Sequence, residues 1–168
     1  IHSETFFANL CNIIYDLELK NINTVIQNIE GIDLIDSVNK IIVQVSAICT
    51  KAKIETSLSK DICKSYREYK FKFVSITKDV SSSFRKKSFI NPYNIPFNPI
   101  HDILDITDFL REIESKDIEH LKNIYNFIKE ELGGQVIDYT KVESNLAQII
   151  NILAEKKLNF NESFPEIN

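Results

Sequence analysis

The strongest structural signal in the chain is the run Gly31-Ile-Asp-Leu-Ile-Asp-Ser-Val-Asn-Lys-Ile-Ile-Val-Gln-Val-Ser46. Hydrophobic and polar residues alternate on both sides of Val38-Asn39, which is typical of two strands joined by a tight turn. If the turn centres on these two residues, Asp33 lies opposite Gln44 on the neighbouring strand. The run therefore predicts a hairpin that holds a carboxylate beside a carboxamide.

This polar pair contributes nothing to the hydrophobic pattern of the hairpin. The period of two places the hydrophobic side chains on the opposite face, namely Ile32, Leu34, Ile41, Val43 and Val45. Oxygen ligands held at a fixed spacing on rigid strands suit a hard divalent cation such as Mg²⁺. The alternative is an exposed hairpin face that carries ordinary polar residues, and the local pattern does not decide between the two.

Length and composition predict one soluble domain. The chain has 168 residues, of which 43% are hydrophobic, and it lacks the ~20-residue apolar run of a membrane span. It begins at Ile1 and contains no methionine, so we expect a fragment of a longer protein. Cys11, Cys49 and Cys63 show no CxxC spacing, which favours reduced thiols and a cytoplasmic location.

Charge is segregated along the chain, which the net charge of -4 conceals. Residues 51–90 carry 11 basic and 4 acidic side chains, whereas residues 1–50 carry 2 basic and 6 acidic ones. This basic segment predicts contacts with a polyanion such as DNA, and the alternative is a solvated surface. The candidate phosphate contacts are Lys51, Lys53, Lys60, Lys64, Arg67, Lys70, Lys72, Arg85, Lys86 and Lys87.

Hydrophobic periodicity predicts an α/β arrangement. We expect a helix over residues 3–19 with Glu4 in its first turn, an extended piece over 23–27, and hairpin strands over 31–36 and 40–48. After Thr50, a candidate N-cap, a helix over 51–69 and a strand over 71–76 should follow. A helix between two strands crosses over the sheet and returns a neighbouring strand.

The rest of the chain is expected to be a loop followed by helices. Residues 79–99 are rich in Ser, Asn and Pro and predict a loop, with 81–87 as its most mobile piece. Helices are expected over 107–114 and 117–132, ended by Gly133-Gly134. Thr140-Lys-Val-Glu143 predicts the capping box of a last helix.

The last helix is a candidate oligomer contact. Its apolar stripe comprises Val142, Leu146, Ile149, Ile150 and Leu153, and such a face must pack on its own domain or on another chain. We therefore predict a domain over 1–135, followed by a C-terminal helix and linker over 136–168 that lead toward a missing downstream region. Self-association into a dimer is the expected role of this helix.

Several kinds of chemistry have no support in the sequence. With three glycines, at positions 31, 133 and 134, neither a P-loop nor a dinucleotide fingerprint is present. His2, His101 and His120 have no zinc-ligand spacing, and no GxSxG motif accompanies the serines.

What remains resembles the SMEK domain of bacterial conflict and defence proteins. The similar stretches are Ser3-Glu-Thr-Phe-Phe7, Asn12-Ile-Ile-Tyr15, Gly31-Ile-Asp-Leu34, Ile42-Val-Gln-Val-Ser46, Phe97-Asn-Pro99 and Asp102-Ile-Leu-Asp-Ile-Thr-Asp-Phe-Leu-Arg-Glu-Ile113. More broadly, a helical Glu, a strand Asp and a following Gln resemble the restriction-endonuclease-like superfamily of PD-(D/E)xK nucleases. The resemblance implies a mixed sheet flanked by helices, with a helical C-terminal extension.

The resemblance also implies a site for Mg²⁺ or Mn²⁺. Asp33 would bind the metal directly, Gln44 would offer its side-chain oxygen, and Val45 its backbone carbonyl. Glu4 would bind a metal-coordinated water or a second ion. The metal would lower the pKa of a bound water and neutralise charge in the transition state of hydrolysis.

One departure from the superfamily pattern bears on whether the site can catalyse hydrolysis. Ser46 stands where the superfamily places a lysine that stabilises developing charge. Lys51 or Lys53, at the start of the next helix, has a long stem that could reach back to that position.

We therefore expect a magnesium-dependent DNA nuclease that serves as an effector in bacterial anti-phage defence. The missing lysine keeps a second reading open, a catalytically inactive module of the same fold that binds nucleic acid or protein. A third reading is an α/β assembly domain that oligomerises through its last helix.

Overall fold

The structure, a computed structural model, describes residues 3–24, 31–77 and 79–132. Within these residues the strands form one sheet, ordered β1 Lys20–Asn21, β2 Leu34–Asp36, β3 Ile41–Ser46, β4 Lys70–Ser75 and β5 Ile103–Leu104. The first three strands pair antiparallel, whereas β3, β4 and β5 pair parallel. The predicted mixed α/β class is confirmed.

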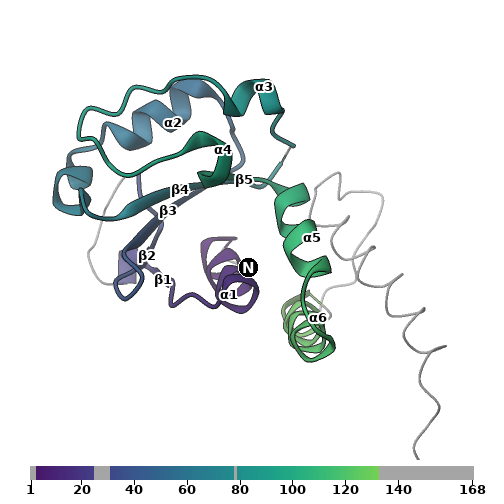
Figure 1. The fold of residues 1–168 in the computed structure, drawn as a ribbon. Helices are drawn as coiled ribbons and strands as arrows, with labels where there is room; N and C mark the ends of the chain where they lie inside the picture. Colours follow the sequence, from purple (N-terminus) through teal and green to yellow (C-terminus); the bar gives the residue numbers. More distant parts are fainter. Residues whose placement is uncertain (1–2, 25–30, 78, 133–168) are drawn as a thin grey trace, which may run out of the picture.

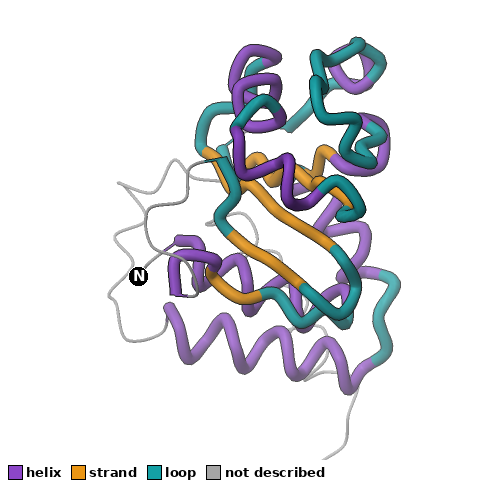
Figure 2. Tube along the Cα trace, turned by 90° about the vertical axis from the view of Figure 1, so that its left-hand side faces the viewer, coloured by secondary structure: helices purple, strands orange, loops and turns teal. Residues whose placement is uncertain are grey.

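Helices cover both faces of this sheet (Figure 1, Figure 2). They are α1 Ser3–Tyr15, α2 Lys51–Leu58, α3 Ser82–Arg85, α4 Pro99–Asp102, α5 Ile106–Glu114 and α6 Ile118–Leu132, with 3-10 turns η1 Ile22–Thr24 and η2 Asp61–Tyr66. In Figure 1, α2 and α3 lie on one side of the sheet and α1 and α6 on the other. None of the described helices is long and apolar enough to cross a bilayer.

The hairpin has the predicted register. Leu34 pairs with Val43, and Asp36 pairs with Ile41, so the turn centres on Val38-Asn39. The Asp33 N–H donates to the Val43 carbonyl at 2.9 Å, which extends the pairing one residue beyond β2. Asp33 and Gln44 therefore lie on adjacent strands, as the alternation of the sequence predicted.

Hydrophobic side chains fill both faces of the sheet. Leu34 and Val43 pack with α1 and α5, whereas Ile42 packs with α2. Ile32 joins the α2 side as well, so its predicted place on the Leu34 face is wrong. Gln44 is 5% exposed and hydrogen-bonds to Ser57 of α2, so it does not lie on an exposed hairpin face.

The first helix is shorter than predicted. It ends at Tyr15 rather than residue 19, because Asp16 adopts φ 54 and the Leu17 N–H returns to the Asn12 carbonyl. The chain then enters β1 at Lys20, earlier than the extended piece predicted over 23–27, and Ile22–Thr24 forms a 3-10 turn. The part of that prediction over 25–27 lies outside the described residues.

The predicted helix over 51–69 is divided in two. Thr50 is its N-cap as expected, with the Lys53 N–H donating to Thr50 Oγ1 at 3.2 Å. The helix stops at Leu58, because Lys60 turns to an extended ψ of 142 before η2 begins. This break brings Ser57 and Lys60 close to Gly31, at the entrance of the hairpin.

The later elements include the two predicted helices together with three elements that the sequence did not predict, namely α3, α4 and β5. α5 and α6 confirm the two predicted helices, and Asp105 and Asp108 form a capping box at the start of α5. The predicted loop piece over 81–87 contains the short helix α3. The Gly133-Gly134 stop, the last helix predicted after Thr140 and its dimer contact all lie outside the described residues.

The turn of the hairpin is organised by Asp36. This carboxylate is fully buried, and it accepts hydrogen bonds from the backbone N–H groups of Glu18, Val38 and Asn39 at 2.7–2.9 Å. The Asn39 side chain donates a fourth bond at 2.8 Å. Burial alone would raise the pKa of Asp36, but these donors outweigh it and lower the pKa. Asp36 thus joins the hairpin turn to the segment that follows α1.

We predict that Asp36→Ala lowers the free energy of unfolding by about 2–4 kcal/mol, because it leaves buried donors without an acceptor. Urea denaturation at neutral pH measures this loss. Glu68→Ala is the control, since it removes an exposed carboxylate paired with Lys40, and it should cost at most about 1 kcal/mol. Equal effects of the two variants would contradict the role of Asp36.

Candidate metal centre

Gly31 determines how the chain enters the site. It adopts φ +93, and a Cβ added there would meet Lys60 Cγ at 2.6 Å. A side chain is therefore excluded both by the backbone conformation and by the close approach of α2. The chain therefore enters the hairpin close to the end of α2, and Asp33 follows two residues after Gly31.

Asp33 and the end of β3 form a close polar contact. The Val45 N–H donates to Asp33 Oδ2 at 2.6 Å, and Gln44 Nε2 donates to the same oxygen at 2.5 Å. Both hydrogen bonds that described residues give to the Asp33 carboxylate thus end on Oδ2, which leaves Oδ1 available to a further ligand. The structure therefore brings together Asp33, Gln44 and Val45, the three direct ligands that the resemblance implied. Glu4, the fourth predicted metal residue, lies in α1.

The Gln44 amide points the opposite way from the prediction. Its Nε2 faces Asp33 and also donates to the Val45 carbonyl at 3.2 Å, while its Oε1 accepts from Ser57 Oγ at 3.5 Å. In this orientation the amide nitrogen, a donor, lies between the two other predicted ligand oxygens. Half a turn about the last side-chain bond would bring Oε1 to that place instead, which is favourable when a cation lies among the three oxygens.

The electrostatics of the site centre on Asp33. Burial raises the pKa of Asp33 to about 6; the Val45 N–H opposes this rise, the Glu4 carboxylate adds to it, and the Lys53 ammonium opposes it. Glu4 and Lys53 are therefore both near enough to Asp33 for their charges to act on it. A cation bound beside Asp33 would relieve the cost of its burial.

Glu4 reaches the site from the other face of the sheet. It lies in the first turn of α1, as predicted, and its Oε2 accepts a hydrogen bond from Asn21 Nδ2 at 2.9 Å. Asn21 belongs to β1 and pairs with Leu34, the residue after Asp33. This chain of contacts holds Glu4 at the end of the sheet where Asp33 lies.

The structure distinguishes between the two lysines of α2. Lys51 is exposed and pairs with Glu55 at 3.5 Å, whereas the charge of Lys53 acts on Asp33. Ser46, which occupies the position of the missing lysine, is engaged locally, since its Oγ donates to the Ile48 carbonyl and accepts from the Ile48 N–H. Lys53 is therefore the better candidate for the missing charge.

The donor set fits Mg²⁺ or Mn²⁺. The Asp33 carboxylate, the Val45 carbonyl and, after rotation of its amide, the Gln44 oxygen are hard oxygen ligands. Mg²⁺ commonly uses one or two carboxylates together with water and substrate phosphate. The described residues contain no cluster of three or more His, Cys, Asp or Glu side chains that could hold a metal by itself. The site therefore suits a weakly held ion that shares its coordination with a substrate.

Arg85 requires a correction, because it belongs to the fold rather than to the predicted DNA contacts. Its side chain is 12% exposed, and Nη2 lies 2.7 Å from Asp105 and 2.6 Å from Asp108. Nη1 donates to the Ile103 carbonyl. This guanidinium joins α3 to β5 and to the start of α5, and it is not available to a phosphate.

Lys70 and Lys72 are also engaged by the fold. Both lie 3.2 Å from Oδ1 of Asp102, a fully buried carboxylate whose Oδ2 accepts from the Asn98 N–H. Removal of either lysine would leave Asp102 with less compensation for its burial. They are therefore weaker candidates for phosphate contacts than the sequence suggested.

The remaining predicted cations lie in two exposed groups. Lys64 of η2 and Arg67, which follows η2, approach the Tyr93 ring at 5.4 and 5.9 Å, and Lys64 pairs with Asp61 at 2.7 Å. Lys86 and Lys87 follow α3, and Lys87 lies 5.2 Å from the Phe84 ring. Lys60 is half-buried, with its stem against Gly31.

Sequence reasoning missed two residues of these sites. Ser57 is a buried hydroxyl on the face of α2 that also carries Ile54 and Leu58, and a polar residue at that helical position was the available signal. Tyr93 had no such signal, because it lies in an irregular segment and meets η2 only through the tertiary fold.

These features define an α/β domain with a hairpin-borne polar centre at one end of its sheet. A sequence model of the SMEK domain matches residues 1–114, so the chain belongs to the SMEK domain family. No curated protein and no solved structure matches the chain.

The buried charge of Asp33 predicts a stability effect that depends on pH. The pKa of the Asp33 carboxyl is raised from 3.8 to about 6, so between these pH values the folded state binds the proton more tightly than the unfolded state does. The free energy of unfolding therefore falls as pH rises from about 4 to about 6. Asp33→Asn removes this loss while keeping an acceptor for the Val45 N–H. We expect the variant to gain about 1–2 kcal/mol relative to the unmodified chain between pH 4 and pH 7.

Asp36→Asn is the matched control, since it changes another carboxylate three positions along the hairpin. The pKa of Asp36 is lowered, so its ionised form stabilises the fold above its unfolded pKa, and this contribution is lost as pH falls. The variant should therefore lose stability at pH 7 and approach the unmodified chain in acid. Urea denaturation between pH 4 and pH 7 measures the stability change of both variants. Changes of the same sign at pH 7 would contradict the opposite pKa shifts assigned to Asp33 and Asp36.

Proposed function

We propose that this chain is a magnesium-dependent nuclease domain of the restriction-endonuclease-like, PD-(D/E)xK superfamily. It hydrolyses phosphodiester bonds in DNA as a cytoplasmic effector of bacterial anti-phage defence. The observation that carries the proposal is the convergence of Asp33, Gln44 and Val45 on adjacent strands, with the charges of Glu4 and Lys53 acting on the same carboxylate.

Each residue has a chemical task in this proposal. Asp33 supplies the one charged ligand through Oδ1, and the Val45 carbonyl and rotated Gln44 amide complete the protein's share of the coordination. When bound, the metal activates a water and neutralises charge on the phosphate. Lys53 offers a cation for the developing negative charge in place of the lysine replaced by Ser46.

Glu4 completes the centre from α1. Its carboxylate is held by Asn21 and can orient a water on the side of Asp33 that faces α1. Two carboxylates near one ion agree with the usual protein share of magnesium coordination.

The second candidate is a catalytically silent module of the same fold that binds nucleic acid or a protein partner. Two observations favour it. Ser46 brings no charge to the site, and the donors around Asp33 satisfy its Oδ2 without any metal. Cleavage therefore separates the two candidates, whereas DNA binding does not.

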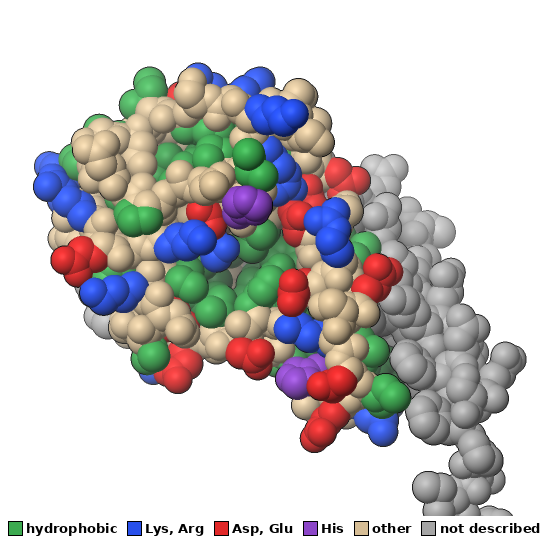
Figure 3. Space-filling model, viewed as in Figure 1, with side chains coloured by type: hydrophobic (Ala, Val, Ile, Leu, Met, Phe, Trp, Pro, Cys, Tyr) green, Lys and Arg blue, Asp and Glu red, His purple; other side chains and the backbone are tan. Residues whose placement is uncertain are grey.

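DNA contacts are assigned to exposed cations that do not compensate a buried carboxylate. Lys64 and Arg67 beside Tyr93 form one group, and Lys86 and Lys87 form another. On the face drawn in Figure 3, Lys and Arg side chains are interspersed with acidic ones rather than joined in one patch. The proposed interface is thus a few discrete phosphate contacts.

We predict that the chain nicks or linearises plasmid DNA with Mg²⁺ or Mn²⁺ and that EDTA abolishes the cleavage. Asp33→Asn should lower the rate by about 100-fold or more, because it removes the charged metal ligand. Lys53→Ala should lower it by at least about 10-fold, whereas Lys51→Ala, the matched control on the same helix, should have little effect. Gel electrophoresis of timed digests measures these rates.

The outcomes separate the candidates. Cleavage that persists in EDTA or in Asp33→Asn would contradict the metal centre. Absence of cleavage by the unmodified chain, together with salt-dependent binding to the same DNA, would favour the silent module.

Charge reversal tests the proposed interface. Lys64→Glu with Arg67→Glu, and separately Lys86→Glu with Lys87→Glu, should weaken binding to all DNA sequences alike. Each pair should also reduce the slope of log affinity against log salt by roughly 1–2. Lys122→Glu with Lys129→Glu is the control, because both lysines are exposed on α6, outside the basic segment. Titrations by fluorescence anisotropy at several salt concentrations give these slopes, and equal slopes for all three pairs would argue against the interface.

A further inference from the structure

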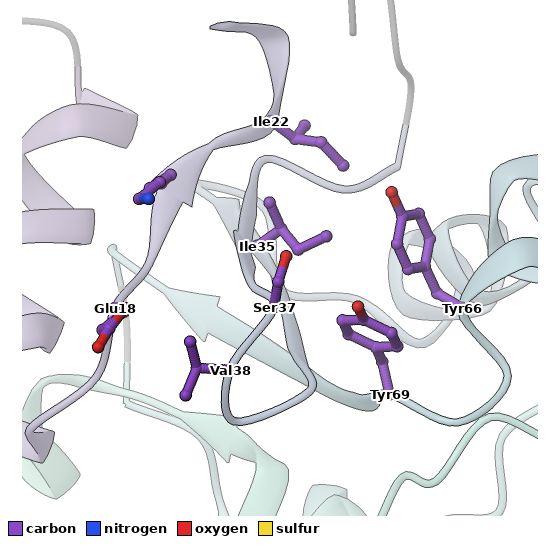
Figure 4. Close-up of a pocket in the computed structure, with 8 residues that line it drawn as sticks. Glu18, Ile22, Ile35, Ser37, Val38, Tyr66 and Tyr69 are labelled. Carbon is purple, nitrogen blue, oxygen red and sulfur yellow. The ribbon is translucent and has the colours of Figure 1, made fainter. Parts of the chain in front are cut away.

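A cavity of about 300 Å³ lies beside the hairpin, on the α2 side of the sheet (Figure 4). Tyr66 and Tyr69 enter it from η2 and the turn that follows, while Ile22 of η1, Ile35 of β2 and Ser37 of the hairpin turn line another side. Its volume is at the lower end of the range for small-ligand sites. The metal centre and the basic segment do not account for this cavity.

Two residues that line the cavity, Ile22 and Ile35, lie close to Asp33 of the candidate metal centre. Ile35 of β2 is two residues after Asp33, about 7 Å along the chain, and it packs on the α2 side of the sheet, where Gln44 of the metal centre meets Ser57. The Ile22 N–H donates to the Asp33 carbonyl at 2.8 Å, which fixes the wall of the cavity to the residue that would bind the metal. A nucleic-acid strand with one phosphate at Asp33 would therefore pass this cavity with a neighbouring nucleotide.

The lining combines aromatic, apolar and polar groups. The Tyr66 and Tyr69 rings are 4.9 Å apart and nearly perpendicular, at 81°, so they offer a ring face and a ring edge to one ligand. Buried Ile22 and half-buried Ile35 supply an apolar floor. Ser37 and the tyrosine hydroxyls can hydrogen-bond to ring heteroatoms.

Charge at the rim indicates where a phosphate would lie. Lys20 lines the cavity and is exposed, so its ammonium is the positive charge at the rim. Glu18 lies nearby and would repel a phosphate, but its carboxylate can accept hydrogen bonds from an exocyclic amino group of a base. Together these groups match a planar, heteroatom-bearing ring attached to an anion.

We propose that this cavity receives an unpaired base adjacent to the phosphate that is bound at Asp33. The inference rests on the proposed function and deepens it, since it assigns the substrate class as single-stranded or locally unpaired DNA. A base within a duplex is stacked and paired, and it would have to be extruded to enter. Base–aromatic stacking tolerates all four bases, so the cavity confers preference for strand type rather than for sequence.

The test measures binding in EDTA, so that neither metal binding nor cleavage contributes. The 168-residue chain is titrated into a labelled 12-nucleotide DNA strand, an abasic strand of equal length and a 12-base-pair duplex, with fluorescence anisotropy as the readout. We expect the intact strand to bind at least about 5-fold more tightly than the abasic strand. Tyr69→Leu should remove this difference, whereas Tyr69→Phe, which keeps the ring, should retain most of it.

Tyr125→Leu is the matched control, because Tyr125 is half-buried on α6, away from this cavity. It should leave the preference unchanged, and thermal unfolding of each variant verifies that the fold is retained. Equal affinity of the unmodified chain for intact and abasic strands would overturn the inference. So would an unchanged preference in folded Tyr69→Leu.

The proposed function can fail independently of this result. If plasmid cleavage with Mg²⁺ is absent but the preference for intact strands depends on Tyr69, the cavity binds bases and the nuclease assignment is wrong. If cleavage occurs and no base preference is found, the nuclease stands and the cavity has no part in binding the strand.

Discussion

The hairpin depends on the hydrogen bonds that the buried carboxylate of Asp36 accepts. Its hydrogen bonds fix the turn and also the Glu18 backbone, so the hairpin register and the path from α1 into β1 are held by one group. A slip of one residue would move every side chain of β2 to the other face of the sheet. Asp33 would then leave the α2 side, and its contact with Gln44 would be lost.

The two carboxylates of the hairpin therefore affect stability in opposite ways when they are ionised. Asp36 receives four hydrogen bonds that outweigh its burial, whereas Asp33 receives two, on a single oxygen, and its pKa is raised to about 6. A charge that the fold leaves undercompensated is typical of functional sites, although ion pairs within a fold can produce similar shifts. The contrast distinguishes a structural carboxylate from a candidate functional one.

The basic segment is divided in the same way. Arg85 forms ion pairs with Asp105 and Asp108, and Lys72 forms one with Asp102. A buried carboxylate needs such a nearby cation. Lys64, Arg67, Lys86 and Lys87 remain exposed and do not compensate a buried charge. The positive charge available to a polyanion is therefore smaller than the count of basic residues suggests.

The amino-acid sequence by itself determined the hairpin, its register and the pairing of Asp33 with Gln44, because alternation and turn position are local properties. It also determined the Thr50 cap and the existence of α5 and α6. Only the tertiary structure decided that Gln44 turns its nitrogen to Asp33, that the charge of Lys53 lowers the pKa of Asp33, and that Lys51 pairs with Glu55 instead. It likewise decided that Arg85 is buried and that Tyr66 and Tyr69 border a cavity, since these facts depend on contacts between segments far apart in the chain.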